Sequence, residues 1–170
     1  NADTGMRNAD GNTALICAVE KNHMNMAKYI IGSKYGADVD VRNANGNTAL
    51  ICAVKNNYIE MVKYLVELKC DMDVKNKDMD TALIYAVKKN HIEIAKYLVE
   101  SKCDADVRKA DGNTALIYAV INNNMKMIKY LIDSKCDADV KNKNMDTALI
   151  CAARYNYFDI LKYLIESNCD

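Results

Sequence analysis

Residues 13–18, Thr-Ala-Leu-Ile-Cys-Ala, return four more times along this chain of 170 residues, with Cys or Tyr in the fifth place. The later copies begin at Thr48, Thr81, Thr114 and Thr147, so the last three steps are equal and the first is longer. A period of about 33 residues is typical of repeat proteins whose units must stack because no unit can bury its apolar face alone. The sequence therefore predicts one structural unit that is repeated five times.

The second copy indicates how one unit folds. Residues 43–47, Asn-Ala-Asn-Gly-Asn, have the composition of a turn. Thr48 can cap a short helix over residues 49–56, and a second amphipathic helix is predicted from about Ile59 to Leu68. Asn57 separates the two helices, because asparagine tolerates the left-handed conformation. Small residues on the first helix and larger aliphatic residues on the second predict a curved stack, with the first helices on its inner side.

These residues resemble the ankyrin repeat, whose pattern Asp-x-x-Gly-x-Thr-Pro-Leu-His is met in register by five units that cover essentially the whole chain. The resemblance implies an all-α ankyrin-repeat solenoid of helix-turn-helix units, joined by β-turn or hairpin-like loops. A single domain over residues 1–170 is expected. Its repeats are predicted at 8–42, 43–75, 76–108, 109–141 and 142–170, after the tail of a preceding repeat at 1–7. Neither end resembles a polar cap, so we expect a fragment of a longer array.

Several family positions carry other residues here. The family's Pro is Ala and its His is Ile in all five copies, and the Gly before the second helix is Asn. The Gly after the second helix survives only as Gly36, while Lys69, Lys102 and Lys135 stand at the matching positions. A left-handed lysine costs about 1–2 kcal/mol, so these helix ends are expected to be reshaped unless they accept that strain. Two extra residues near Gly36 predict a longer second helix or a bulged loop.

Composition narrows the classes of function. The 23 Lys and Arg residues balance 23 Asp and Glu residues, so no net positive field favours nucleic acid or an anionic membrane. The longest apolar run, residues 115–121, is far shorter than the roughly 18 residues of a membrane span. Neither nucleic-acid binding nor membrane insertion is therefore expected.

The seven cysteines follow the repeat rather than a disulfide framework. Three fill the fifth place of the hexapeptide, and the other four recur once in each repeat from Cys70 onwards. Equivalent atoms in stacked layers are expected about 8–10 Å apart, which exceeds the roughly 7 Å that a disulfide allows between Cα atoms. We therefore expect reduced thiols that serve as small hydrophobic residues, in an intracellular and cytoplasmic protein.

No catalytic, metal or cofactor site is predicted, and the chain is not expected to be an enzyme. No nucleophile set can be placed around the only two histidines, His23 and His91, which fall where the ankyrin pattern uses His structurally. Four Asp-x-Asp pairs, such as Asp38 and Asp40, lack the bidentate Glu of a calcium loop. They are better interpreted as turn-stabilising residues.

A column of tyrosines, one on each second helix, allows two interpretations. Its members are Tyr29, Tyr64, Tyr97, Tyr130 and Tyr163. Such a ladder could stack on the bases of single-stranded nucleic acid. A half-buried packing column beside the apolar stripe is the simpler interpretation.

The predicted binding residues are those at which the copies differ, because shared positions serve the stack. In the ankyrin family the end of the first helix and the preceding turn form a concave binding face, and the Cys/Tyr place should point the same way. On this face the predicted residues are Tyr85, Lys88, Lys89, Tyr118, Ile121, Asn122, Arg154 and Tyr155, with Lys75, Arg108 and Lys141 along the turns. Random divergence between the copies is the alternative explanation.

The predicted function is a non-catalytic scaffold that binds a mildly acidic protein partner through the turn tips and the first helices of repeats three to five. Tyr and Arg are common anchors of such interfaces. A regulatory or targeting segment of a larger enzyme or channel is the alternative, and nucleic-acid binding is less favoured. Self-association through the uncapped ends is a further expectation.

Overall fold

The computed structural model of the chain describes residues 5–34 and 36–167. Within these residues there are ten α-helices and no strand. The helices are α1 (Ala14–Glu20), α2 (Met24–Gly32), α3 (Ala49–Lys55), α4 (Ile59–Glu67), α5 (Ala82–Lys88), α6 (Ile92–Glu100), α7 (Ala115–Ile121), α8 (Met125–Asp133), α9 (Ala148–Arg154) and α10 (Phe158–Glu166). The all-α helical repeat predicted from the hexapeptide is confirmed.

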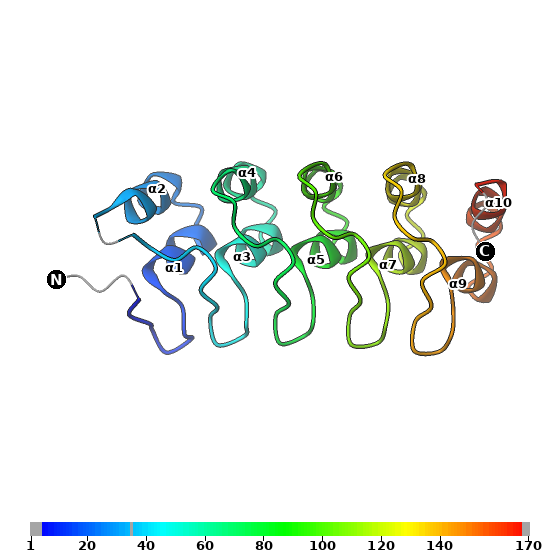
Figure 1. The fold of residues 1–170 in the computed structure, drawn as a ribbon, viewed down its shortest axis with the longest axis horizontal. Coiled ribbons are helices and arrows are strands. Elements are labelled where there is room, and N and C mark those ends of the chain that lie inside the picture. The colour runs from blue at the N-terminus through cyan, green and yellow to red at the C-terminus, as the bar shows by residue number, and fades with distance from the viewer. Residues whose placement is uncertain (1–4, 35, 168–170) are drawn as a thin grey trace. The chain divides into compact units, whose positions relative to one another are not determined.

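Contacts divide the chain into two compact units, Asn1–Tyr85 and Ala86–Asp170, named here the first unit and the second unit. In the first unit α1 contacts α2 and α3, and in the second unit α7 contacts α8 and α9. Within each unit, Figure 1 shows one row of first helices, one row of second helices, and long loops whose tips extend beyond the first helices. The repeat boundaries, the single domain and the curvature of the stack stay predictions.

The threonine of the hexapeptide starts each first helix. The hydroxyl of Thr48 accepts a hydrogen bond of 3.3 Å from the backbone N–H of Ile51, which satisfies one of the amides that a helix start leaves unpaired. The other four threonines make the same bond. After the first helix, Asn57 has φ 58°, and the matching residues Asn22, Asn90, Asn123 and Asn156 also have positive φ. The predicted caps and left-handed asparagines are confirmed.

The isoleucine that replaces the family histidine is buried in four of the five copies. Ile16, Ile51, Ile84 and Ile117 are each 1% exposed, whereas Ile150 is 43% exposed. At the four buried positions the side chain adds apolar burial, worth about 2 kcal/mol for a fully buried aliphatic residue. The hexapeptide therefore packs these units through aliphatic contact at this position.

The lysines after the second helices keep the left-handed conformation, with φ 60° at Lys69, 69° at Lys102 and 63° at Lys135. The expectation that these helix ends are reshaped is therefore wrong. The next residue explains the result: the N–H of Cys103 donates to the carbonyl of Leu98 at 3.2 Å, which is the closing bond of a Schellman motif. The turn places Cys103 in the core, so apolar burial offsets the backbone strain.

The two extra residues of the first repeat do not lengthen its second helix. α2 has nine residues, as the other second helices do. It is followed by Ser33 in an extended conformation, and the insertion lies in the loop over residues 33–36, of which residue 35 is outside the described residues. The longer helix is therefore a wrong prediction.

Asparagine side chains join the turn tips within each unit. The Oδ1 of Asn43 accepts hydrogen bonds from the N–H groups of Asn45 and Asn47, both at 3.0 Å. Its Nδ2 donates to the Oδ1 of Asn12 in the preceding repeat at 2.8 Å. In the second unit Asn142 makes the same three kinds of bond. These mostly buried amides set the distance between neighbouring tips.

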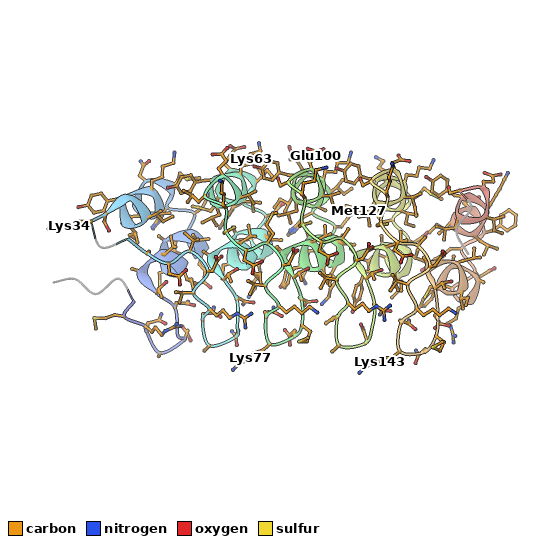
Figure 2. The ribbon with its side chains drawn as sticks, in the orientation of Figure 1. Lys34, Lys63, Lys77, Glu100, Met127 and Lys143 are labelled. Atoms are coloured by element: carbon orange, nitrogen blue, oxygen red, sulfur yellow. The ribbon has the colours of Figure 1, made fainter. Side chains whose placement is uncertain are left out.

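The tips approach each other so closely that Gly46 has no room for a side chain. Gly46 has φ 76°, and a Cβ on it would lie 2.8 Å from the backbone nitrogen of Lys77. The N–H of Lys77 donates to the carbonyl of Asn45 at 3.0 Å. Figure 2 shows Lys77 on a tip of the first unit and Lys143 on a tip of the second.

Candidate functional site

The structure places the predicted binding residues in both units. Lys75 and Tyr85 lie in the first unit, where both are half-buried. The second unit contains Lys88, Lys89, Arg108, Tyr118, Ile121, Asn122, Lys141, Arg154 and Tyr155. Nine of the eleven predicted residues therefore belong to the second unit.

The hydroxyl of Tyr118 on α7 is hydrogen-bonded, and two lysine ammonium groups lie near its ring. Its hydroxyl donates to the Oδ2 of Asp111 at 2.6 Å. The Nζ atoms of Lys88 and Lys109 lie 5.7 and 6.0 Å from the centre of its ring, within the range of cation–π attraction. The half-buried ring thus stands between the end of α5 and the fourth turn in a fixed position.

A substitution in the fourth turn explains how Asp111 becomes available to Tyr118. Lys109 stands where the other four turns have the asparagine, and a lysine cannot accept the turn's amide hydrogen bonds. Asp111 instead accepts from the N–H of Asn113 at 2.9 Å and from its Nδ2 at 3.0 Å. Burial by itself raises the pKa of Asp111, but the hydrogen bonds from Tyr118 and Asn113 and the charge of Lys109 lower it below its usual value.

Lys88, Lys89 and Asn122 meet at the other end of the first helices, in a groove between two interhelical loops of the second unit. The groove has a volume of about 630 Å³, and its lining residues are Lys88, Lys89, Asn90, Asn122, Asn123, Asn124, Met125 and Lys126. This set is named the loop groove. The Nδ2 of Asn122 donates to the carbonyl of Val87 at 3.1 Å, which ties the two loops together.

Arg154 forms an ion pair with the fifth turn and is also exposed at the surface. Its Nη2 lies 2.6 Å from the Oδ1 of Asp146, a buried carboxylate. The hydrogen bond to Asp146 and the negative charge of that group raise the pKa of Arg154. Beside it, the ring of Tyr155 stacks on Tyr157 with 5.8 Å between centroids. Arg108 and Lys141 are exposed, and Ile121 is half-buried.

Three copies of the ankyrin repeats family model match residues 1–78, 35–109 and 83–170. The chain belongs to the ankyrin-repeat family. A search of curated proteins found no match. Ankyrin repeats generally mediate protein–protein interactions and are typically non-catalytic modules. No described helix of this ankyrin chain is long and apolar enough to cross a membrane.

The fifth place of the ankyrin hexapeptide does not always face the surface. Cys52 and Cys151 are 1% and 3% exposed, whereas Cys17, Tyr85 and Tyr118 are half-buried. The expectation that this place points to the binding face is therefore wrong for the two buried cysteines. A small thiol fits inside the stack, whereas the phenol of Tyr118 extends to the turn.

None of the six described cysteines of this ankyrin chain takes part in a disulfide. They are Cys17, Cys52, Cys70, Cys103, Cys136 and Cys151, and Cys169 lies outside the described residues. Burial raises the pKa of Cys52 and of Cys70 to about 12. These two thiols are protonated at neutral pH and are therefore not activated nucleophiles.

The two histidines lie directly before second helices, and the Asp-x-Asp pairs form hydrogen bonds within and between turns. His23 and His91 precede α2 and α6, and neither makes a side-chain capping bond. The Oδ1 of Asp38 accepts from the N–H of Asp40 at 2.9 Å, and Asp40 accepts from the N–H of Asp71 in the next repeat at 3.0 Å. The pairs therefore stabilise turns, as predicted. Among the described residues no group of three or more His, Cys, Asp or Glu could hold a metal.

Tyrosines of the column contact the preceding second helix at Tyr64 and Tyr130, whereas Tyr29, on the first of these helices, is 80% exposed. Lys28 lies over Tyr64 at 5.4 Å. In the second unit Lys96 lies over Tyr130 at 5.1 Å, and the hydroxyl of Tyr130 donates to the carbonyl of Lys96 at 3.1 Å. Each of these rings already has a lysine of the preceding helix on one face. This geometry favours the packing column over base stacking.

Sequence reasoning missed two parts of this surface. It did not single out Asp111 and Lys109, although the loss of the turn asparagine in the fourth repeat was visible. It also missed Met125 and Lys126 of the loop groove. A comparison of the copies could have found Lys126, because Glu60 and Glu93 stand at the matching place.

Proposed function

We propose that this ankyrin-repeat chain is a non-catalytic scaffold whose protein partner docks on the tips and first helices of the second unit. The observation that carries the proposal is the setting of Tyr118, with its hydroxyl 2.6 Å from Asp111 and two lysine ammonium groups near its ring. Exposed Tyr155 and half-buried Ile121 extend the apolar part of the surface.

The geometry of Tyr118 suits an interface anchor. A tyrosine offers a large apolar area with a polar end and loses little rotamer freedom when it binds. Because the ring is already fixed, less conformational entropy is lost on docking. The exposed cations Arg108 and Lys141 precede the turns before α7 and α9, and their charge favours a partner with carboxylates near its own apolar contact.

Selection of displayed random peptides on the immobilised chain tests this proposal. The selected peptides should bind the Tyr118→Ala variant at least tenfold more weakly than the wild type, because truncation of an anchor typically costs about 2 kcal/mol. The matched control is Tyr97→Ala on α6, another half-buried tyrosine of the second unit, which should leave the affinity unchanged. Equal affinities for wild type and Tyr118→Ala, with both folded by circular dichroism, would refute the proposed surface.

Charge reversal at Arg108 and Lys141 gives a second test. Both side chains are exposed, so their replacement by glutamate should not unfold the turn. Arg154 is a poorer choice, because its loss removes a partner of buried Asp146. The double variant Arg108→Glu with Lys141→Glu should weaken the selected acidic peptides, and the weakening should shrink as salt is added.

A further inference from the structure

The loop groove is positively charged. It is lined by Lys88, Lys89 and Lys126, and none of the described residues that line it is acidic. The Nζ of Lys88 lies 5.7 Å from the centre of the Tyr118 ring, so Lys88 belongs to both surfaces. Its remaining polar groups are asparagine amides, which can donate to a carboxylate or to a peptide carbonyl. The groove therefore offers positive charge and hydrogen-bond donors on one side of the second unit.

The walls of the loop groove are fixed in place. The Nδ2 of Asn124 donates to the Oδ1 of Asn90 at 2.6 Å, across the two loops. Asn123 and Asn90 have φ values of 52° and 59°, and Asn122 donates to the backbone at the end of α5. A ligand would thus meet a preformed surface, which lowers the entropic cost of binding.

A second groove adjoins the loop groove and shares Asn123 and Met125 with it. This groove, of about 510 Å³, mixes polar and apolar groups, because Asn156, Tyr157, Phe158, Asp159 and Ile160 also line it. Phe158 is 71% exposed, so its ring is accessible to a ligand. Lysines and an accessible apolar ring therefore follow one another along three interhelical loops.

The matching loops of the first unit have the opposite charge. Glu20 and Glu60 stand where the second unit has Lys88 and Lys126, and Lys21 matches Lys89. Glu20 accepts a hydrogen bond from Asn12 at 3.0 Å, and Glu60 lies 2.9 Å from the Nζ of Lys63. Equivalent positions of the repeat thus accept side chains of either charge, so folding of the repeat does not require the three lysines.

We propose that the loop groove and the second groove bind an extended acidic segment of a partner protein. The segment has two or more carboxylates, which face Lys89 and Lys126, and a large apolar side chain that packs on Met125 and Phe158. This inference rests on the proposed function, because it supposes that the chain binds proteins. The loop groove shares Lys88 with the surroundings of Tyr118, but its test changes only Lys89 and Lys126.

The distance between the two grooves predicts how many residues separate the carboxylates of the peptide from its apolar side chain. The grooves lie one repeat apart, which is about 8–10 Å for packed helices. An extended chain advances about 3.3 Å per residue. The apolar side chain should therefore follow the last carboxylate by about three residues.

The test uses a fluorescein-labelled peptide, Gly-Asp-Glu-Asp-Ser-Gly-Leu-Phe-Gly, and the whole chain, with binding measured by fluorescence anisotropy. Two matched peptides replace the acids by their amides or the Leu-Phe pair by Ser-Ser. The groove variant is Lys89→Glu with Lys126→Glu, and α4 and α6 already carry glutamate at the second of these positions. The control variant is Lys21→Glu with Lys55→Glu, which makes the same change of charge in the first unit.

We expect the acidic peptide to bind the wild type and the control variant alike, and to bind the groove variant at least tenfold more weakly. The loss of several charge contacts, each worth up to about 1 kcal/mol, accounts for a tenfold rise in the dissociation constant. Both matched peptides should bind more weakly than the parent. Equal binding by the two variants, or by the amide peptide, would overturn the proposal. Preferential binding of a labelled ten-nucleotide thymidine strand would do so too, because it would assign the groove to nucleic acid.

The two proposals can fail separately. If the acidic peptide does not bind, while Tyr118→Ala still loses the selected peptides, the loop groove is not a site and the proposed function stands. If the acidic peptide binds as expected and Tyr118→Ala changes nothing, the binding surface lies at the interhelical loops alone.

Discussion

Asn43 in the first unit and Asn142 in the second make the same contacts. Each Oδ1 accepts hydrogen bonds from two N–H groups of its own turn, and each Nδ2 donates to the preceding turn, at 2.8 Å and 2.9 Å. At the interhelical loops, by contrast, Glu20 and Glu60 of the first unit replace two lysines of the loop groove.

This comparison separates what the repeat needs from what it permits. The mostly buried amides cannot change without leaving polar groups unpaired, which costs about 1–3 kcal/mol for each group. The charges at the loops are solvated, so either sign is tolerated at a cost of a few tenths of a kcal/mol. Differences between the units are therefore informative about binding at the loops, and about stability at the tips.

The largest effect is expected at Gly46, one of the tip glycines of the first unit. Gly46→Ala should destabilise the chain by about 3 kcal/mol, because a left-handed alanine costs roughly 1–2 kcal/mol and its Cβ would displace Lys77 and weaken the hydrogen bond between the tips. Urea denaturation followed by circular dichroism measures the change. The control is Gly32→Ala in α2, where a Cβ meets no atom within 4 Å. A loss at Gly46 below about 1 kcal/mol, the strain of the alanine alone, would show that the tips are not tightly coupled.

The next effect tests whether equivalent turn asparagines stabilise the two units equally, which is called here the shared framework. Asn43→Ala and Asn142→Ala should each lower the free energy of unfolding by about 2 kcal/mol, because each removes bonds within a turn and one bond between turns. Asn8→Ala, which removes the same pair of bonds within its own turn, should cost about half as much. The shared framework would be disproved if the losses at Asn43 and Asn142 differed by more than about 1 kcal/mol, the net worth of one hydrogen bond.

A smaller effect, of opposite sign, is expected where the second unit has methionine at the tip. Met145 has φ 63° in the place that glycine fills at Gly46 in the first unit and at Gly112 in the second, and Met79 of the first unit is also left-handed, with φ 60°. Met145→Gly should stabilise the chain by about 1 kcal/mol, because it relieves the strain of a left-handed side chain. Met145→Ala keeps that strain and should bring no gain in the same denaturation measurement. A gain with alanine would point to exposure of the methionine as the cause.

Local features of this fold could be predicted from the sequence. Thr48 and Asn57 act within one turn of their own position, so their residue types already specify a cap and a left-handed residue. Lys102 was different, because its strain was visible in the sequence while the compensation was not. That compensation is the burial of Cys103 against the stack, which depends on residues far away in the chain.

The candidate site was predictable to a similar degree. Differences between copies led to Tyr118 and Lys88, but not to the bond that fixes Tyr118, because Asp111 belongs to the preceding turn. The loop groove was missed because Lys126 follows the start of α8 and looked like an ordinary solvated helix residue. Its meaning depends on Lys89, which lies in another repeat.

The smallest effect concerns the contact between Tyr118 and Asp111, whose places are filled by Cys52 and Asn45 in the second repeat and by Tyr85 and Asp78 in the third. Tyr118→Phe removes the hydrogen bond to Asp111 and should cost about 0.5 kcal/mol at pH 7, a low value because the carboxylate is exposed. The pKa of Asp111 is lowered in the folded chain. The stabilisation is therefore present above the unfolded pKa of about 3.9 and is lost as the pH falls through the folded value.

Urea denaturation of wild type and Tyr118→Phe at pH 7 and at pH 2 measures this dependence. The difference in unfolding free energy between the two proteins should be present at pH 7 and shrink towards zero at pH 2. Asp111→Asn is the control, because it keeps an acceptor but has no charge to titrate, so the effect of Tyr118→Phe in its background should not vary with pH. A difference of equal size at both pH values would mean that the phenol acts on packing rather than through the Asp111 carboxylate.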